Sequence, residues 1–242
     1  MEKKLTRKQK QYRGQFAADE HPLVVTPIHQ RRKVTEPLKP QTEAQAFYLD
    51  AMTTHELIFG TGPAGTGKTY VAAAYAAQEL LAKRTSRVII TRPNIEVGQP
   101  MGFLPGELEE KYAPFLAPFR EVMIERMGVS HYEYAIKAGQ ICPEPLGYMR
   151  GKTFDDAIVI LDEAQNCTPA EMKMFLTRIG KNCTVIVNGD IQQCDLSGPS
   201  GLSDAIKRVN KIDGVAIVEF SEGDIVRSGM VREILKAYRR RV

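Results

Sequence analysis

The residues whose types and spacing most clearly predict chemistry lie in the stretch "GTGPAGTGKT" at positions 60–69. Gly62, Gly67, Lys68 and Thr69 meet the pattern G-x-x-x-x-G-K-[ST], which arises by chance in about one chain in a hundred of this length. Backbone N–H groups of such a loop curl around a phosphate, and the following helix points its positive end at the same anion. In this arrangement Lys68 reaches the β- and γ-oxygens, and Thr69 places its hydroxyl on a magnesium ion.

The residues flanking this loop match the strand, loop and helix that a phosphate-binding loop requires. The run "ELIFG" precedes it and "KTYVAAAYAAQELL" follows it. A glycine-rich turn with a purely structural role is the alternative. The residues predicted to bind the nucleotide phosphates are Gly62, Pro63, Ala64, Gly65, Thr66, Gly67, Lys68 and Thr69.

A second group of reactive residues follows an apolar run in "AIVILDEAQ". Ile158–Leu161 lead to two adjacent acids, Asp162 and Glu163. Magnesium bound to phosphates needs a hard oxygen ligand, so Asp162 is predicted to join Thr69 as a metal ligand. Glu163 is predicted to be the base that orients or deprotonates an attacking water. An ordinary strand end is the alternative, but together with the loop the pair favours hydrolysis over transfer to a metabolite.

The stretch "VNGDIQQ" ends a further apolar run and is polar throughout its second half. Its exit is expected beside the strand that carries Asp162, because both would end at the same edge of a parallel sheet. Asn188, Asp190 or Gln193 could then sense the γ-phosphate. A plain polar turn is the competing interpretation.

Two isolated residues are candidates for roles at the same site. Gln45, upstream of the loop, could clamp an adenine edge, although Thr42 to Gln45 also reads as a T-x-x-Q capping box at a helix start. Arg227 in "DIVRSG" could stabilise charge on the γ-phosphate as an arginine finger. Arginines in surface loops commonly have no such role.

The elements that must position these residues alternate between strand and helix. Short apolar runs rich in β-branched residues, separated by helical patterns, are typical of a parallel sheet covered on both faces. The fold class predicted is therefore α/β with a doubly wound, mostly parallel sheet. The expected strands are 56–60, 87–91, 156–162, 183–190 and 214–220.

Two helices and one long connection are also marked. The Ala-rich run 67–83 predicts a helix, and a second helix is expected to start at Thr168 with Pro169 and Glu171 in its first turn and to stop at Gly180. Residues 94–156 are too many for a simple connection. They are interpreted as an insertion at the sheet edge, with a helix near 108–126.

Composition and charge narrow the class of protein. The 242 residues accommodate one α/β domain, predicted at 39–242, after a basic, loosely ordered leader at 1–38. Residues 1–40 carry a net charge of +6 and the remainder −2, so the leader could follow a phosphodiester backbone or be a solvated tail. The four cysteines lack zinc or disulfide spacing. No membrane span or signal sequence is apparent, and a cytoplasmic location is expected.

Nine segments, in this order and spacing, resemble the PhoH family of phosphate-starvation-associated P-loop ATPases: "GPAGTGKT", "TRP", "GFLPGELEEKYAPF", "YMRGKTF", "VILDEAQN", "EMKMFLTRIG", "VIVNGDIQQCDL", "SGLSDA" and "DIVRS". The resemblance covers about Pro40 to the C-terminus. It implies a RecA-like core similar to that of superfamily 1 helicases, ATP and Mg²⁺ as cofactors, and a role in RNA metabolism. Motif I then holds Lys68 and Thr69, motif Ia Thr91, Arg92 and Pro93, motif II Asp162 and Glu163, and motif III Gln193.

The resemblance also shapes the expected mechanism and partners. The catalytic residues predicted are Lys68, Glu163, Gln193 and Arg227. Helicases place ATP between two RecA-like lobes, whereas this chain has sequence for one, so a homo-oligomer, such as a ring, is expected to supply the missing wall. RNA or single-stranded DNA is the expected partner. A nucleotide-dependent switch that gates a protein partner is the main alternative, and a small-molecule kinase is a weaker one because no Arg-rich lid segment is apparent.

Overall fold

Short runs of β-branched and other apolar residues form the sheet at the centre of the fold. Its strands are β1 (Leu57–Thr61), β2 (Arg87–Thr91), β3 (Ile141–Pro143), β4 (Ala157–Leu161), β5 (Cys183–Gly189) and β6 (Val215–Glu219). They are arranged in the order β3-β2-β4-β5-β1-β6, and every neighbouring pair is parallel. The predicted parallel α/β sheet is confirmed.

The structure is a computed structural model that describes residues 36–93 and 108–226, with the side chains of 108–115 excepted. These residues belong to a single compact unit. Nearly all of the predicted leader, and the predicted finger Arg227, lie outside the described residues. Within the described ranges there is no helix long and apolar enough to cross a membrane.

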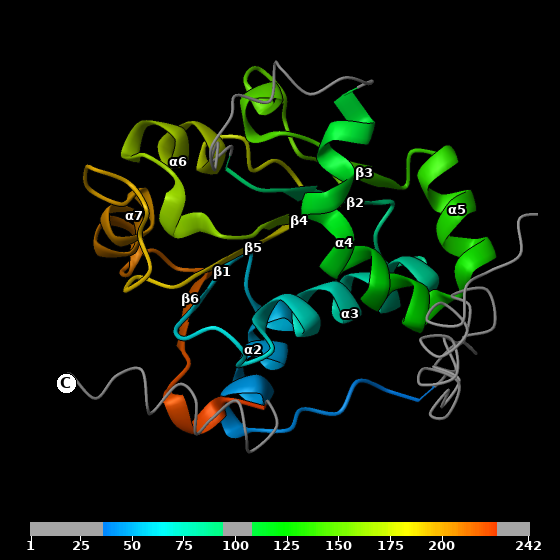
Figure 1. Cartoon of the computed structure of the whole chain (residues 1–242), viewed down its shortest axis with the longest axis horizontal. Coiled ribbons are helices and arrows are strands. Elements are labelled where there is room, and N and C mark those ends of the chain that lie inside the picture. Colours follow the sequence, from blue (N-terminus) through cyan, green and yellow to red (C-terminus); the bar gives the residue numbers. More distant parts are fainter. Residues whose placement is uncertain (1–35, 94–107, 227–242) are drawn as a thin grey trace, which may run out of the picture. The chain divides into compact units, whose positions relative to one another are not determined.

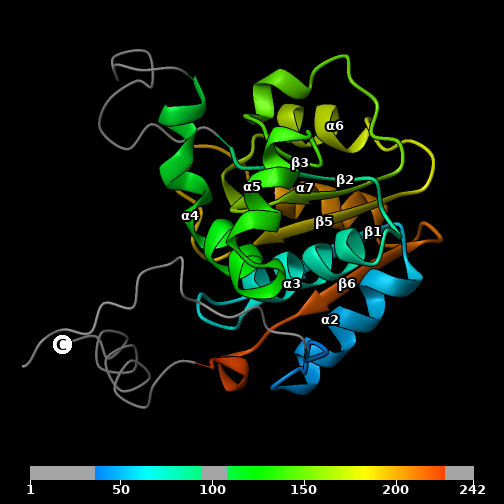
Figure 2. The ribbon, with the colours of Figure 1, turned by 90° about the vertical axis from the view of Figure 1, so that its right-hand side faces the viewer.

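Helices cover both faces of the sheet, which makes it doubly wound (Figure 1). The α-helices are α2 (Glu43–Thr54), α3 (Lys68–Leu81), α4 (Leu108–Met127), α5 (Val129–Lys137), α6 (Pro169–Leu176) and α7 (Gly201–Val209). One face packs against α2, α3, α4 and α5, and the other against α6 and α7. Figure 2 shows the sheet between α3 and α6. Short 3₁₀ turns are η3 (Leu146–Met149), η4 (Ala164–Asn166) and η5 (Glu222–Asp224).

Alternation along each strand builds the two halves of the core. In β4, Ile158 and Ile160 face the α3 layer, whereas Val159 and Leu161 face the α6 layer. All five residues of β4 are buried, which explains why the strand reads as a continuous apolar run. The helix α3 is alanine-rich because small side chains let it pack closely between the sheet and α4. These contacts fix the start of α3, where Lys68 and Thr69 lie.

The helix that begins after Thr168 is shorter than the sequence predicts. Its start is as expected, with Pro169 at the first helical position and a capping box between Thr168 and Glu171. However, α6 ends at Leu176 rather than at Gly180. The following residues pair with the chain ahead of β4, where Ile179 forms a β-bridge with Phe154. Hydrogen bonding to this neighbouring segment therefore replaces the last turn of the predicted helix.

The long connection after β2 contributes helices and an edge strand. The helix expected near 108–126 is confirmed as α4, and α5 and the strand β3 follow it. β3 pairs only with β2 among the described strands and lies at the edge of the sheet. No sequence signal marks β3, because it has three residues and ends in proline, a residue tolerated at sheet edges.

Candidate nucleotide site

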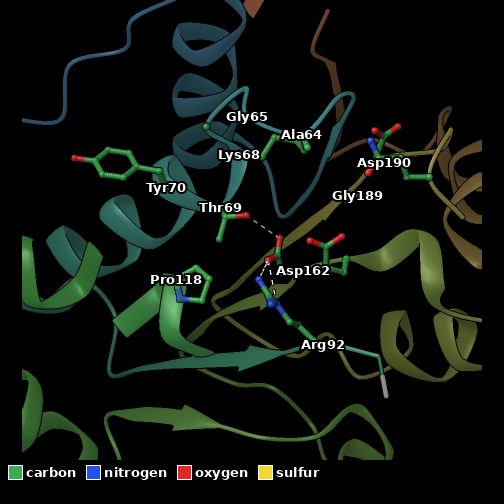
Figure 3. A pocket seen from close by; sticks show the side chains of 13 residues that line it. Ala64, Gly65, Lys68, Thr69, Tyr70, Arg92, Pro118, Asp162, Gly189 and Asp190 are labelled. Carbon is green, nitrogen blue, oxygen red and sulfur yellow. Dashed lines mark hydrogen bonds and ion pairs between the residues drawn. The ribbon is translucent and has the colours of Figure 1, made fainter. Parts of the chain in front are cut away.

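The functional residues meet at the carboxyl edge of the sheet, where loops follow parallel strands (Figure 3). β1 leads into the phosphate-binding loop, β2 into Arg92, β4 into Asp162 and β5 into Asp190. A cavity of about 330 Å³ lies between them. Its lining residues are Ala64, Gly65, Gly67, Lys68, Thr69, Tyr70, Arg92, Pro118, Asp162, Glu163, Gly189, Asp190 and Gln193.

The loop between β1 and α3 needs glycine at both of its ends. Gly62 has φ +134°, and a Cβ there would lie 2.2 Å from the carbonyl oxygen of Phe220. Gly67, the N-cap of α3, has φ +86°, and a Cβ would lie 2.7 Å from the Gln45 side chain. Both conformations are costly for residues with a side chain. The two glycines therefore allow the loop to close tightly against its neighbours and to aim its amides at an anion.

Lys68 lies inside the loop that it is predicted to serve. Its Nζ donates to the carbonyl oxygens of Gly62 at 2.7 Å and Pro63 at 2.8 Å. A third hydrogen bond, of 3.1 Å, reaches Thr66 Oγ1. Burial lowers the pKa of the Lys68 ammonium below its ordinary value, although nearby carboxylates oppose the shift. The loop thus holds a positive charge at the point where phosphate oxygens are expected.

Thr69 and Asp162 come together from elements far apart in the sequence. The Thr69 hydroxyl donates to Asp162 Oδ1 over 3.0 Å. The other carboxylate oxygen, Asp162 Oδ2, accepts two hydrogen bonds from Arg92. The shorter of these, 2.5 Å long, comes from Nη2. Figure 3 shows the Asp162 side chain pointing at both partners. The Arg92 guanidinium also lies over the Phe119 ring, 5.6 Å from its centroid.

The surroundings of Asp162 fit a magnesium ion. The residue is only 2% exposed, and burial raises the pKa of its carboxyl above the ordinary value while Arg92 opposes the shift. A buried carboxylate is costly without a cation, and the guanidinium meets that need here. A carboxylate beside a hydroxyl is also the oxygen donor set that Mg²⁺ prefers next to phosphates. Thr69 and Asp162 would therefore hold the ion.

Glu163 is placed by an unusual backbone turn and by a side chain that sequence reasoning missed. It has φ +57°, a left-handed conformation that costs about 1 kcal/mol for a residue with a side chain. Gln165 Nε2 donates to Glu163 Oε2 over 2.7 Å, and Gln165 Oε1 accepts the Asp190 N–H over 3.0 Å. Gln165 is 3% exposed, so it rigidly links the acidic pair to the end of β5. The only sequence signal for this role was its position within "DEAQ".

The three residues considered as γ-phosphate sensors separate into two groups. Asp190 and Gln193 line the cavity, and the Gln193 N–H donates to the Asp190 carbonyl oxygen over 3.0 Å. Asn188 instead lies buried beneath the loop, where its Oδ1 accepts the Tyr48 hydroxyl. The exit of β5 does lie beside β4, as expected. Sensing by Gln193 stays a prediction, and Asn188 is not among the residues that line the cavity.

Gln45 contacts the phosphate-binding loop itself. Its Oε1 accepts the Gln41 N–H at 2.8 Å, and its Nε2 donates to the Thr66 carbonyl oxygen at 2.9 Å. Thr42 caps α2 as the alternative interpretation expects, but the full capping box does not form because the Gln45 side chain bonds to Gln41 rather than to Thr42. The adenine contact of Gln45 stays a prediction.

The residue before Arg227 also contacts the loop. Val226 donates its backbone N–H to the Gly65 carbonyl oxygen over 3.1 Å, and Ile225 is buried. The described chain thus ends against the phosphate-binding loop. It arrives there from β6, which neighbours β1 on one side, whereas β5 and the Asp162 strand β4 lie on the other side of β1. The role of Arg227 as a finger stays a prediction.

A parallel sheet with this loop, an acidic pair after a central strand, and helices on both faces defines a P-loop NTPase of RecA-like fold. The family model described as PhoH-like protein matches residues 37–239. The chain belongs to the PhoH family.

Curated relatives agree with this assignment, and a solved structure shares the fold. Protein PhoH of Escherichia coli (strain K12) is 49% identical over 84% of this chain and 59% of its own length. PhoH-like protein of Bacillus subtilis (strain 168) is 45% identical over 83% of this chain and 64% of its own length. The chain thus spans about three-fifths of these relatives. The large terminase of a thermophilic bacteriophage superposes with a TM-score of 0.53 at 12% identity, over 84% of this chain and 52% of the terminase, which shows a shared fold.

Proposed function

We propose that this protein hydrolyses ATP with magnesium and couples hydrolysis to the binding or remodelling of RNA or single-stranded DNA. The observation that carries the hydrolytic part is the meeting of Thr69 with Asp162, 3.0 Å apart, beside Glu163 in one cavity. A Mg²⁺ ion held by Thr69 and Asp162 would neutralise part of the phosphate charge. Two further features support the nucleic-acid part, namely the net charge of +6 on residues 1–40 and the resemblance of Thr91, Arg92 and Pro93 to motif Ia.

Different residues of the chain bind the phosphates, activate the attacking water and sense the γ-phosphate. The loop amides and Lys68 bind the phosphates. Contacts with buried neighbours hold the loop and the Lys68 side chain in position. Glu163 accepts the proton of the attacking water on one carboxylate oxygen, while Gln165 holds the other oxygen in place. Gln193, which lines the cavity, contacts the γ-phosphate, and this contact changes the loop after β5.

Steady-state phosphate release tests the coupling directly. Single-stranded RNA or DNA is expected to raise the rate of phosphate release, because a ligand that binds the catalytically competent state more tightly shifts the population toward that state. The oligonucleotide concentration that gives half stimulation should rise with salt concentration. A plot of its logarithm against the logarithm of the salt concentration should have a slope of about 0.7 for each phosphate contact. Rates with single-stranded RNA, single-stranded DNA and duplex are compared with the rate without nucleic acid.

The outcomes of this assay separate the rival functions. Phosphate release that none of the three nucleic acids changes would contradict the coupling and favour the nucleotide-dependent switch. A phosphorylated metabolite in place of free phosphate would identify a kinase. A variant lacking residues 1–35 shows whether the basic leader or the core carries the affinity for nucleic acid.

A neighbouring copy of the chain is proposed to complete the site. The described residues form a single RecA-like lobe, and Val226 brings the chain next to the phosphate-binding loop just before Arg227. We expect a homo-oligomer in the presence of an ATP analogue and magnesium, and an Arg227→Ala variant with turnover lower by about 1,000-fold. Light scattering measures the assembly, and Arg232→Ala, which changes another arginine of the same segment, is the control. A monomer with full turnover would refute the proposal.

A further inference from the structure

The turn that follows β3, residues 146–152, carries an exposed aromatic ring close in sequence to two cations. Tyr148 is 60% exposed, and Arg150 and Lys152 are exposed close to it in sequence. This η3 turn, as residues 146–152 are called below, has no part in the nucleotide cavity. An exposed ring close to cations matches the surfaces that bind single-stranded nucleic acid.

The η3 turn is anchored firmly, so its exposed residues are held in place. Leu146 and Met149, one 3₁₀ turn apart, are 2% and 0% exposed and pack in the core cluster that includes α6. Side chains three residues apart in a 3₁₀ helix lie on the same side. Tyr148 therefore projects away from the core. In Figure 1 the chain leaves β3 and runs toward α6 before it enters β4.

The surface next to Tyr148 is open enough to admit a base. The glycines at 147 and 151 have nothing within 4 Å of where a Cβ would be. The absence of side chains at these two positions leaves space for a flat ligand to approach the turn. Stacking on such a ring is available to every base, because each has a π-face.

The charge around Tyr148 favours a phosphate backbone. Arg150 has no ion-pair partner within the described ranges. Lys152 pairs with Glu144 at 2.6 Å, and Arg178 approaches the Lys152 carbonyl oxygen at 3.5 Å. Arg150, Lys152, Arg178 and Glu144 carry three positive charges against one negative charge, so the charged side chains at and next to the η3 turn are net positive.

The strand that leads into the η3 turn ends near the nucleotide site. The Glu144 N–H donates to the Ile90 carbonyl oxygen at 2.9 Å, which places the exit of β3 directly beside the exit of β2. Arg92 follows β2 and pairs with Asp162 after β4, the next strand along the sheet. The end of β3, from which the chain enters the η3 turn, is therefore two strands away from the end of β4, which leads to the predicted magnesium ligand Asp162.

We propose that the η3 turn is a contact site for single-stranded nucleic acid, in which the Tyr148 ring stacks on a base and Arg150 binds the adjacent phosphate. This inference rests on the proposed nucleic-acid function and assigns its contact surface. RNA and single-stranded DNA share the chemistry that the site recognises. The experiment below distinguishes them by using a probe of each kind.

Fluorescence anisotropy of the full chain with a labelled oligouridylate or oligothymidylate, each of about 12 nucleotides, tests the site. Tyr148→Ala is expected to weaken binding about 10-fold, whereas Tyr148→Phe, which keeps the ring, binds like the parent protein. Arg150→Gln is expected to make the slope of log affinity against log salt concentration shallower by about 0.7, the value for one phosphate contact on a single strand. Unchanged unfolding temperatures show that the variants fold.

Tyr134→Ala is the matched control. Tyr134 is 62% exposed on α5, which ends shortly before β3 begins and so leads to the opposite, amino edge of the sheet. Its removal should leave affinity unchanged. If the parent protein binds the probes and Tyr148→Ala binds equally well, the η3 turn is not the contact site. If the parent protein binds neither probe, the nucleic-acid function itself fails, and this inference fails with it.

Discussion

Replacing Lys68 with alanine is expected to abolish tight ATP binding. The Lys68 ammonium is held at the mouth of the loop by two carbonyl oxygens and the Thr66 hydroxyl. Its removal leaves the carboxylates of Asp162 and Asp190 facing a triphosphate without that cation. Removing one partner of a buried charged interaction costs about 3–5 kcal/mol, so ATP affinity should fall at least about 100-fold.

Calorimetric titration with a non-hydrolysable ATP analogue measures this loss. Lys137→Ala is a suitable control, because it removes an exposed lysine from the last turn of α5, away from the lining of the cavity. The control should bind the analogue with the parent affinity. A Lys68→Ala protein that is folded and binds the analogue as tightly as the parent would show that the loop is not the phosphate site.

Replacing Glu163 with glutamine is expected to separate binding from hydrolysis. Glutamine has nearly the shape of glutamate and can still accept the hydrogen bond that Gln165 donates at 2.7 Å. It cannot take a proton from water at neutral pH. Because general-base catalysis contributes about 10²–10⁴-fold, turnover should fall by at least about 100-fold while ATP affinity is retained.

Single-turnover phosphate release, measured together with analogue binding, distinguishes these two effects. Glu133→Gln, an exposed change on α5 that removes the same charge, is the matched control and should keep full turnover. Parent-like turnover in Glu163→Gln would remove this residue from the role of base. Loss of binding would instead assign it to nucleotide affinity.

Much of the fold followed from local patterns. The five predicted strands lie within one residue of the observed bounds, because parallel strands buried on both faces are apolar along their whole length. The errors occurred where local signals were weak. β3 is too short to show a pattern, and α6 ends early because Ile179 pairs with Phe154, a residue distant in sequence. The helices α5 and α7 also went unpredicted.

The site was predicted unevenly for a similar reason. Contiguous motifs indicated the phosphate-binding loop and the pair Asp162 and Glu163, because each is a short pattern whose spacing implies its chemistry. No pattern indicated that Arg92 would pair with Asp162, or that Gln165 would link Glu163 to the end of β5. These contacts depend on which strands are neighbours.

The sequence by itself determined the class of this protein, since a phosphate-binding loop and an acidic strand end can be recognised from a few consecutive residues. Only the tertiary structure decided which side chains share the carboxyl edge of the sheet. The order β3-β2-β4-β5-β1-β6 places Asp162 between Arg92 and the end of β5, and puts the end of β3, which leads into the η3 turn, beside the end of β2. Strand order is set by the packing of helices on both faces, a long-range property that no short stretch of sequence contains.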